Sequence, residues 1–157
     1  MAEAVRWLDG VETRAWRSFL TASGRLLQRL DEELVAATGL ALADYEVLAM
    51  LSHSPDGQMR MAALADCVLI SPSGLTRRLD RLTQEGLVDR SVCPTDRRGV
   101  FAVLTAEGRR RLEAAAPVHV AGVRRYFLDG LDRRQLGVVA RAMTSVAERS
   151  EGRPACG

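Results

Sequence analysis

The chain has 157 residues, of which 47% are hydrophobic and only 4% aromatic. That length suits one domain or two small subdomains, and a core built mainly from Leu, Val and Ala favours packed helices over an all-strand fold. No stretch approaches about 18 uninterrupted apolar residues and the N-terminus lacks the apolar core of a signal peptide, so we expect a cytoplasmic protein without a membrane segment. Cys67, Cys93 and Cys156 form an odd set without metal-ligand spacing, which predicts neither a disulfide framework nor a metal site.

The net charge is only +2, but the charges are unevenly distributed. From Ser71 to Arg111 there are nine arginines and five acidic residues, whereas the rest of the chain has 13 arginines and 15 acidic residues. The chain contains no lysine, for which a genomic preference for arginine codons is the simplest explanation. Every cation is therefore a guanidinium, a group suited to bidentate contacts with phosphates or bases.

The first half of the chain shows three segments with helical spacing of apolar residues. A long helix is predicted over about 11–37, with Gly39 just beyond it as a stop. Two shorter helices are predicted over about 43–52 and about 62–69, separated by the turn "SPDGQ". The apolar stripe of the first helix is wider than a small domain needs, which indicates that part of it faces a second subunit.

A fourth helix has the clearest boundaries. Ser71 can cap it, Pro72 suits its first position, and Gly86 can close it in a left-handed conformation. One face of this helix carries only leucine, at Leu75, Leu79 and Leu82. On or beside the other face lie Ser73, Gly74, Thr76, Arg77, Asp80 and Arg81.

The apolar period changes after this helix. "LVDRSVC" and "VFAVL" are typical of two strands, and "PTDRRG" between them supplies the turn residues of a β-hairpin. Two short helices, a sharply capped helix and an arginine-tipped hairpin together predict a winged helix-turn-helix. In that arrangement the second helix of the motif lies in the DNA major groove, and the hairpin reaches the neighbouring minor groove or the phosphates.

Two further helices are predicted after the hairpin. The first is capped by Thr105 and spans about 106–128, with Pro117 expected to kink or interrupt it. The second begins after Asp132, with Gln135 completing a capping box, and runs to about residue 149. We expect residues 151–157 to form a disordered tail.

The segments "LALADYEVLAML" and "MAALADCVLISPSGLTRRLDRLTQEGLVDRSVCPTDRRGVFAVLTAEG" resemble the MarR family of bacterial transcription regulators, and the resemblance covers about 11–149. It implies a mainly α fold with a small β-hairpin wing. It also implies a homodimer in which residues 1–40 and 106–150 form the dimerisation region and residues 41–105 form the winged helix-turn-helix lobe. The partner would be double-stranded DNA with a pseudo-palindromic operator whose half-sites lie about one helical turn apart.

The position of the arginines on the second helix of the motif favours DNA contact over a merely solvated helix face. We assign base or phosphate contact to Ser73, Gly74, Thr76 and Arg77, and phosphate contact to Arg81. Arg78 is less clearly directed outward. Ser71 is primarily a cap, although a helix N-terminus can also bind phosphate.

The resemblance extends to the hairpin tip. It implies that Arg98 enters a narrow minor groove, that Arg97 meets phosphate, and that Asp80 and Asp96 orient wing arginines through ion pairs. For Arg90, on the first strand, a structural role and a phosphate contact are equally open. The arginine run 109–111 at a helix start reads as a solvated face.

Members of this family often respond to small phenolic or lipophilic anions bound between the dimerisation and DNA-binding regions. Trp16, Arg25 and Tyr45 are the candidate lining of such a cleft, with core packing as the alternative for Trp16 and Tyr45. Peroxide-sensing members use a cysteine near the chain start, which is absent here. Among the three cysteines, Cys93 beside the wing turn is the one to test for a redox response.

We therefore predict a homodimeric DNA-binding regulator, usually a repressor, that needs no cofactor. The alternatives are a winged-helix module that binds protein instead of DNA, and a thiol-based redox sensor. The sequence has no phosphate loop, metal-ligand set or nucleophile with a nearby base, so it does not predict an enzyme.

Overall fold

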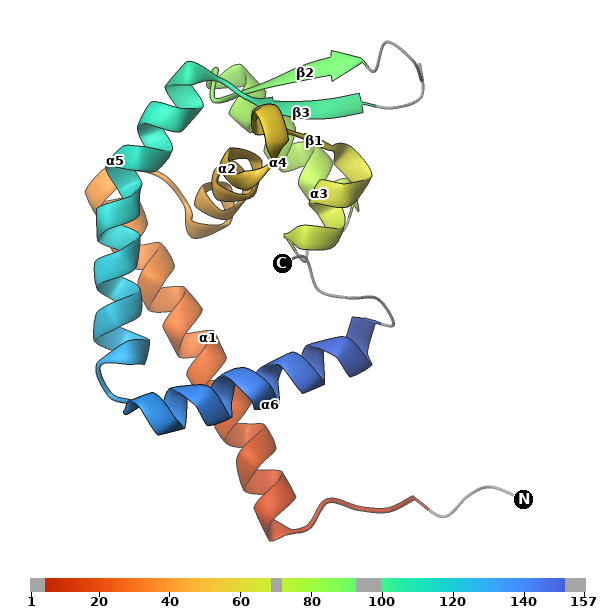
Figure 1. Cartoon of the computed structure of the whole chain (residues 1–157), viewed down its shortest axis with the longest axis vertical. Coiled ribbons are helices and arrows are strands. Elements are labelled where there is room, and N and C mark those ends of the chain that lie inside the picture. The colour runs from red at the N-terminus through yellow and green to blue at the C-terminus, as the bar shows by residue number, and fades with distance from the viewer. Residues whose placement is uncertain (1–4, 69–71, 93–99, 152–157) are drawn as a thin grey trace.

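A computed structural model describes residues 5–68, 72–92 and 100–151, and within them it contains six α-helices and a three-stranded antiparallel sheet (Figure 1). The elements in chain order are α1 (Gly10–Thr38), α2 (Leu42–His53), the 3-10 turn η1 (Pro55–Gly57), β1 (Gln58–Arg60), α3 (Met61–Cys67), α4 (Pro72–Gln84), β2 (Val88–Val92), β3 (Val100–Leu104), α5 (Ala106–Val123), the π-helical turn η2 (Arg124–Leu128) and α6 (Arg133–Glu151). Helices α1 and α5 pack against each other, and α2, α3, α4 and the sheet gather at one end of this pair (Figure 1). The predicted mainly helical fold with a β-hairpin is confirmed.

Both ends of helix α1 are capped by residues close to them in the sequence. The Asp9 carboxylate accepts hydrogen bonds from the backbone N–H groups of Val11 and Glu12, and the Glu12 carboxylate accepts one from the Asp9 N–H at 2.9 Å. This reciprocal box satisfies donors that have no partner inside the helix. At the other end Gly39, with φ of 71°, stops the helix as predicted.

The core lies mainly in the lobe formed by α2, α3, α4 and the sheet. The fully buried side chains are Leu34, Val47, Leu48, Leu51, Leu64, Leu75, Leu79, Leu82 and Val88. Burying one such side chain contributes at most about 1.5–3 kcal/mol, so this cluster supplies much of the driving force for folding. The predicted leucine face of α4 is confirmed as its buried face.

Helix α4 ends at the predicted glycine. Gly86 has φ of 71°, and the Leu87 N–H donates to the Leu82 carbonyl at 2.8 Å. This closure turns the chain directly into β2. Pro72 is the first residue of α4, as predicted, while the expected cap Ser71 lies outside the described residues.

The hairpin is part of a larger sheet than the sequence indicated. Strands β2 and β3 pair antiparallel with Val88 opposite Leu104, and β1 pairs with the other edge of β3, giving the order β1-β3-β2. The short segment "QMR" lacks the alternating apolar pattern of a strand. Its pairing with β3 depends on the tertiary contact that sets Met59 opposite Ala102.

Helix α5 begins as predicted, because the Thr105 hydroxyl accepts a hydrogen bond from the Gly108 N–H at 2.9 Å. Of the two effects expected of Pro117, a kink or an interruption, the interruption is wrong, since the α-helix continues to Val123. Contacts with α1 and α2 hold α5 in place and outweigh the hydrogen bond that proline removes. The chain then widens into η2, where the Asp129 N–H donates to the Arg124 carbonyl at 2.9 Å.

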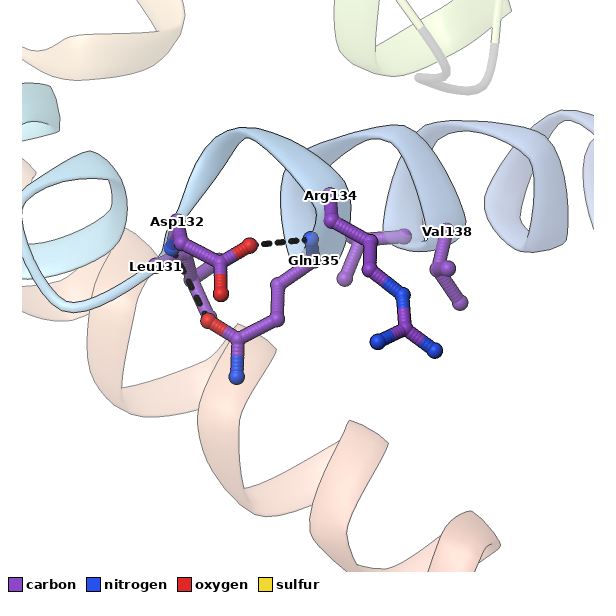
Figure 2. A pocket seen from close by; sticks show the side chains of 6 residues that line it. Leu131, Asp132, Arg134, Gln135 and Val138 are labelled. Atoms are coloured by element: carbon purple, nitrogen blue, oxygen red, sulfur yellow. Dashed lines mark hydrogen bonds between the residues drawn. The ribbon is translucent and has the colours of Figure 1, made fainter.

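Helix α6 starts with the capping box that the sequence predicted. The Gln135 N–H donates to the Asp132 carboxylate, and the Asp132 N–H donates to the Gln135 side-chain oxygen, each at 2.8 Å (Figure 2). The helix runs to Glu151, two residues beyond the predicted end. Of the predicted disordered tail, residues 151–157, Glu151 instead ends α6, and residues 152–157 lie outside the described residues.

Cys67 is disulfide-bonded, whereas the odd number and the spacing of the cysteines predicted no disulfide framework. The error arose because the spacing of cysteines along the chain does not report their distance in space. Cys93 and Cys156 lie outside the described residues. No single described helix is long and apolar enough to span a membrane; only α1 and α2 taken together, with a bend of 83° between them, meet that criterion.

The junction between α2 and α5 contains a ring pair. Tyr45 of α2 and His119 of α5 have ring centroids 4.5 Å apart. The His119 Nδ1 atom is buried and has no hydrogen-bond partner within the described part of the chain. Burial lowers the pKa of His119 and raises the pKa of Tyr45, so both rings are favoured in their neutral forms.

We predict that Gly108→Ala destabilises the protein. A Cβ atom on Gly108 would lie 2.0 Å from the Leu87 carbonyl oxygen and 2.8 Å from Leu104 Cδ1, so backbone must move to admit it. The expected loss in the free energy of unfolding is about 2 kcal/mol or more, measured by urea denaturation. In Gly130→Ala the added methyl group meets nothing within 4 Å, and a change within about 0.5 kcal/mol is expected. Equal stability of both variants would contradict the packing at Gly108.

We also predict that His119 makes the protein less stable at mildly acidic pH. Because burial depresses the folded-state pKa of His119 below 6.5, the unfolded chain binds the proton first. The free energy of unfolding should therefore fall as the pH drops through about 6.5 and continue to fall until the folded-state pKa is reached. His119→Phe should reduce the difference in stability between pH 7.5 and pH 5.5, whereas His53→Gln, at an exposed site, should leave it unchanged. An unaltered pH dependence in His119→Phe would refute the assignment.

Candidate nucleic-acid interface

The face of α4 opposite the leucines is open to solvent. Ser73, Thr76 and Arg77 are exposed and Gly74 is half-buried, so these four residues share the outer side of the helix. The arrangement follows from the helical period of 3.6, which separates them from the buried leucines by about half a turn. A polar helix face without a bulky residue at Gly74 lets another surface approach closely.

Arg77 differs from the other two arginines of α4. Its exposed guanidinium makes no ion pair or hydrogen bond with any residue that the structure describes. Together with Gly74, Arg78 and Arg81 it lines an open concavity of about 290 Å³. A cation with no internal partner is free to bind an external acceptor such as a phosphate or a guanine edge.

Arg78 and Arg81 both bind the same buried carboxylate. Arg78 Nη1 donates to Asp44 Oδ1 at 2.7 Å, and Arg81 Nη2 donates to Asp44 Oδ2. The Asp44 side chain, on α2, is only 5% exposed. Arg81 also lies 3.9 Å from the Glu85 carboxylate, and its side chain remains half exposed.

Sequence reasoning missed Asp44. Its signal was a carboxylate, one of two with Glu46, in the largely apolar run "LALADYEVLAML", where a buried charge is costly unless it is paired. The partners stand 34 and 37 residues away and could not be identified from spacing. Arg78 proves to be directed inward, and Arg81, expected at phosphate, is already held by Asp44 on one side.

Asp80 pairs with an arginine of the hairpin strand. Arg90 Nη2, on β2, donates to Asp80 Oδ1 at 2.7 Å and lies 3.4 Å from the Thr76 carbonyl oxygen. Both partners are substantially exposed, 49% for Asp80 and 35% for Arg90, so solvent and salt screen this pair. The contact connects α4 to the hairpin.

The tip of the hairpin, residues 93–99, and residues 69–71 just before α4 are not included in the described residues. Four predicted site residues fall there, namely Ser71, Asp96, Arg97 and Arg98. Their assigned roles stay predictions. Of the arginine run that was interpreted as a solvated face, Arg109 and Arg110 are exposed, and Arg110 pairs with Glu107 at 2.5 Å.

The three residues of the candidate ligand cleft lie on two helices. Trp16 and Arg25 are exposed on α1, while Tyr45 is half-buried on α2 against His119. Trp16 is 53% exposed and stacks on Phe19 at 6.1 Å between ring centroids, so the alternative of core packing is wrong for Trp16 within one subunit. No group of three or more His, Cys, Asp or Glu side chains suited to a metal ion occurs in the described ranges.

Comparison with known proteins places the chain among transcription regulators. The sequence model of the MarR family matches residues 38–99. The regulator MhqR of Bacillus subtilis is 33% identical over 85 residues, which span 54% of this chain and only 57% of that protein. The repressor MdtR of the same organism is 28% identical over 131 residues, covering 80% and 83% of the two chains.

Solved structures agree over nearly the whole length. Sco3205, a MarR family regulator from Streptomyces coelicolor solved in complex with DNA, has a TM-score of 0.89 and 38% identity, covering 93% of this chain and 91% of that one. AbsC, from the same organism and family, has a TM-score of 0.89 and 39% identity, and the match covers 95% of this chain and 100% of AbsC. CouR from Rhodococcus jostii RHA1, solved with p-coumaroyl-CoA, has a TM-score of 0.71 and 28% identity, and the match covers 81% of this chain and 87% of CouR.

Proposed function

The chain belongs to the MarR family of transcriptional regulators, and we propose that it is a homodimeric, cytoplasmic repressor that binds a pseudo-palindromic operator. The observation that supports this proposal is the exposure of polar and basic side chains on the outer face of α4. There the exposed residues surround Arg77, the one α4 arginine that no described residue pairs with. Similarity to Sco3205, which was solved with DNA, supports placing DNA against this face.

We assign the contacts by their position on α4 and the wing. Ser73, Gly74, Thr76 and Arg77 face the major groove, with Arg77 suited to a guanine edge. Arg81 and Arg90 keep exposed donors beside their ion pairs and reach phosphates. For the residues outside the described ranges we retain the sequence-based assignment. Ser71 is primarily the cap of α4 and can also bind a phosphate, Arg97 meets a phosphate, Arg98 enters the minor groove, and Asp96 helps to orient the wing arginines.

The homodimer is supported by apolar side chains that a single subunit leaves in solvent. They lie on the segment leading into α1, on α1, on η2 and on α6, and include Trp7, Leu8, Val11, Trp16, Phe19, Leu20, Leu27, Tyr126, Phe127, Val138, Met143 and Val146. A surface of this kind marks a protein interface. We therefore propose that residues 1–40 and 106–150 form the dimerisation region and that residues 41–105 form the DNA-binding lobe.

We further propose that a small phenolic or lipophilic anion relieves repression. The similarity to CouR, which was solved with p-coumaroyl-CoA, supports this class of effector. The ring pair of Tyr45 and His119 lies at the contact between α2 and α5, where a bound molecule could change the position of the DNA-binding lobe. Trp16 and Arg25 would contribute from the exposed side of α1.

The proposed function is tested by fluorescence anisotropy with DNA from the promoter region upstream of the gene, over a salt series. Affinity should fall steeply with salt, because phosphate contacts release counterions. Arg77→Ala should lose about 1–3 kcal/mol of discrimination at one base pair in each half-site, measured with single-base variants of the site. Arg110→Ala removes the same charge from a surface pair with Glu107 and should leave base preference intact.

Two results would contradict this proposal. Affinity that does not depend on salt would favour the protein-interaction module over a DNA-binding protein. Unchanged base preference in Arg77→Ala, beside an intact control, would remove Arg77 from the set of base-reading residues.

We predict that Phe19→Glu dissociates the dimer. Phe19 is 41% exposed in one subunit, so a charge there should leave the subunit folded and act only where a second subunit covers the side chain. Sedimentation velocity at about micromolar concentration should show a monomer with unchanged circular dichroism. Ala63→Glu, at an exposed position on α3, should remain dimeric. A dimeric Phe19→Glu protein would place the interface elsewhere.

A further inference from the structure

The three arginines of α4 do not have equal access to a ligand, and Asp44 is the reason. We propose, on the basis of the proposed function, that Asp44 is a positioning residue for DNA recognition. Its ion pairs keep Arg78 from contacting DNA and restrict the movement of Arg81. Arg77 is therefore the α4 arginine whose guanidinium is available to contact base pairs. The effect is to make binding depend on the geometry of one arginine rather than on the summed charge of three.

The first support is the burial of the Asp44 carboxylate. Its side chain is 5% exposed, and it is the one charged residue in the buried set of the described chain. A buried carboxylate is costly unless each oxygen has a partner. Arg78 satisfies Oδ1 and Arg81 satisfies Oδ2, so the fold itself holds both guanidiniums on the α2 side of α4.

Arg78 is the more firmly held of the two. Its side chain is 25% exposed, and its Nε atom is buried without a hydrogen-bond partner in the described residues. Its charge also lowers the pKa of Glu46, a second acidic residue of α2, whose pKa burial raises by a larger amount. Arg78 is therefore held by its ion pair with Asp44 and attracted electrostatically by Glu46, and both interactions oppose its movement toward a phosphate.

Arg81 is restrained but not removed from the surface. Half of its side chain is exposed, and its second acidic neighbour, Glu85, is 3.9 Å away on the same helix. Asp44 binds the Nη2 atom of Arg81, and the exposed half of the side chain remains accessible to an external acceptor such as a phosphate.

The pair formed by Asp80 and Arg90 shows why the burial of Asp44 is important. Asp80 also faces a guanidinium at 2.7 Å, yet both side chains are exposed, so the high dielectric of water weakens their attraction. The Asp44 carboxylate is buried and Arg78 is largely buried, so water and salt screen this pair less, whereas the Arg81 side chain is itself 50% exposed. Of these acidic residues, Asp44 is the one able to hold an arginine back against the attraction of a DNA backbone.

Asp44→Asn tests the proposal because asparagine keeps the size of the side chain but removes its charge. Released Arg78 and Arg81 side chains would bind phosphates without regard to sequence. Affinity for a random-sequence duplex should rise on the order of tenfold, and the slope of log K against log salt should steepen by about 0.9 for each phosphate gained. The ratio of affinities for a duplex selected by the wild-type protein and for the random duplex should fall.

Two further variants serve as controls. Glu113→Gln changes the net charge by the same amount at an exposed position on α5, and its salt slope should match that of the wild type. In Arg78→Gln the withheld guanidinium is absent, and the salt slope should again match the wild type. The double variant Asp44→Asn with Arg78→Gln should return part of the way from the Asp44→Asn slope to the wild-type slope.

The outcomes separate the two proposals. If the wild-type protein shows no salt-dependent binding to either duplex, the proposed function is wrong and the role of Asp44 fails with it. If the wild-type protein binds but Asp44→Asn shows an unchanged slope, or loses affinity for both duplexes by one factor, only the role of Asp44 is overturned. If Asp44→Asn does not fold, the salt slope of Arg78→Gln tests the role of Asp44. A slope shallower than that of the wild type would show that Arg78 contacts phosphate and would overturn this role, whereas an equal slope would support it.

Discussion

The burial of one leucine face of α4 is the constraint on which the candidate interface depends. Leu75, Leu79 and Leu82 are almost completely excluded from solvent, so the rotation of α4 about its own axis is fixed. Once that rotation is fixed, the helical period decides that Thr76 and Arg77 face outward and that Arg78 turns toward α2. The polarity of the outer face is therefore a consequence of the core, as much as of the polar residues themselves.

Charge on this surface is governed by pairing rather than by composition. The segment from Ser71 to Arg111 has four more arginines than acidic residues, yet its described arginines differ widely in availability. Asp44, which lies outside that segment, binds Arg78 and Arg81, while Asp80 binds Arg90. A count of local charges overstates the free positive charge of α4, because the compensating carboxylate comes from another helix.

The features that could be predicted well from the sequence are those that depend on residues close together in the chain. The leucine spacing of α4, the left-handed turn at Gly86 and the capping box of Asp132 with Gln135 all rest on contacts between near neighbours in the chain. The failures share the opposite property. Strand β1 exists through pairing with β3, more than 40 residues later, and the Asp44 pair spans 34 residues. Such contacts leave no periodic pattern in the sequence.

Helix α2 connects the candidate interface to the rest of the subunit through two consecutive residues. Asp44 reaches α4, whereas Tyr45, about 100° further around the helix, packs on His119 of α5. A helix moves as a rigid rod over a few residues, so α2 cannot shift at its contact with α5 without carrying the Asp44 carboxylate with it. The orientation of Arg78 and Arg81, which bind Asp44, is for this reason coupled to the packing between α2 and α5.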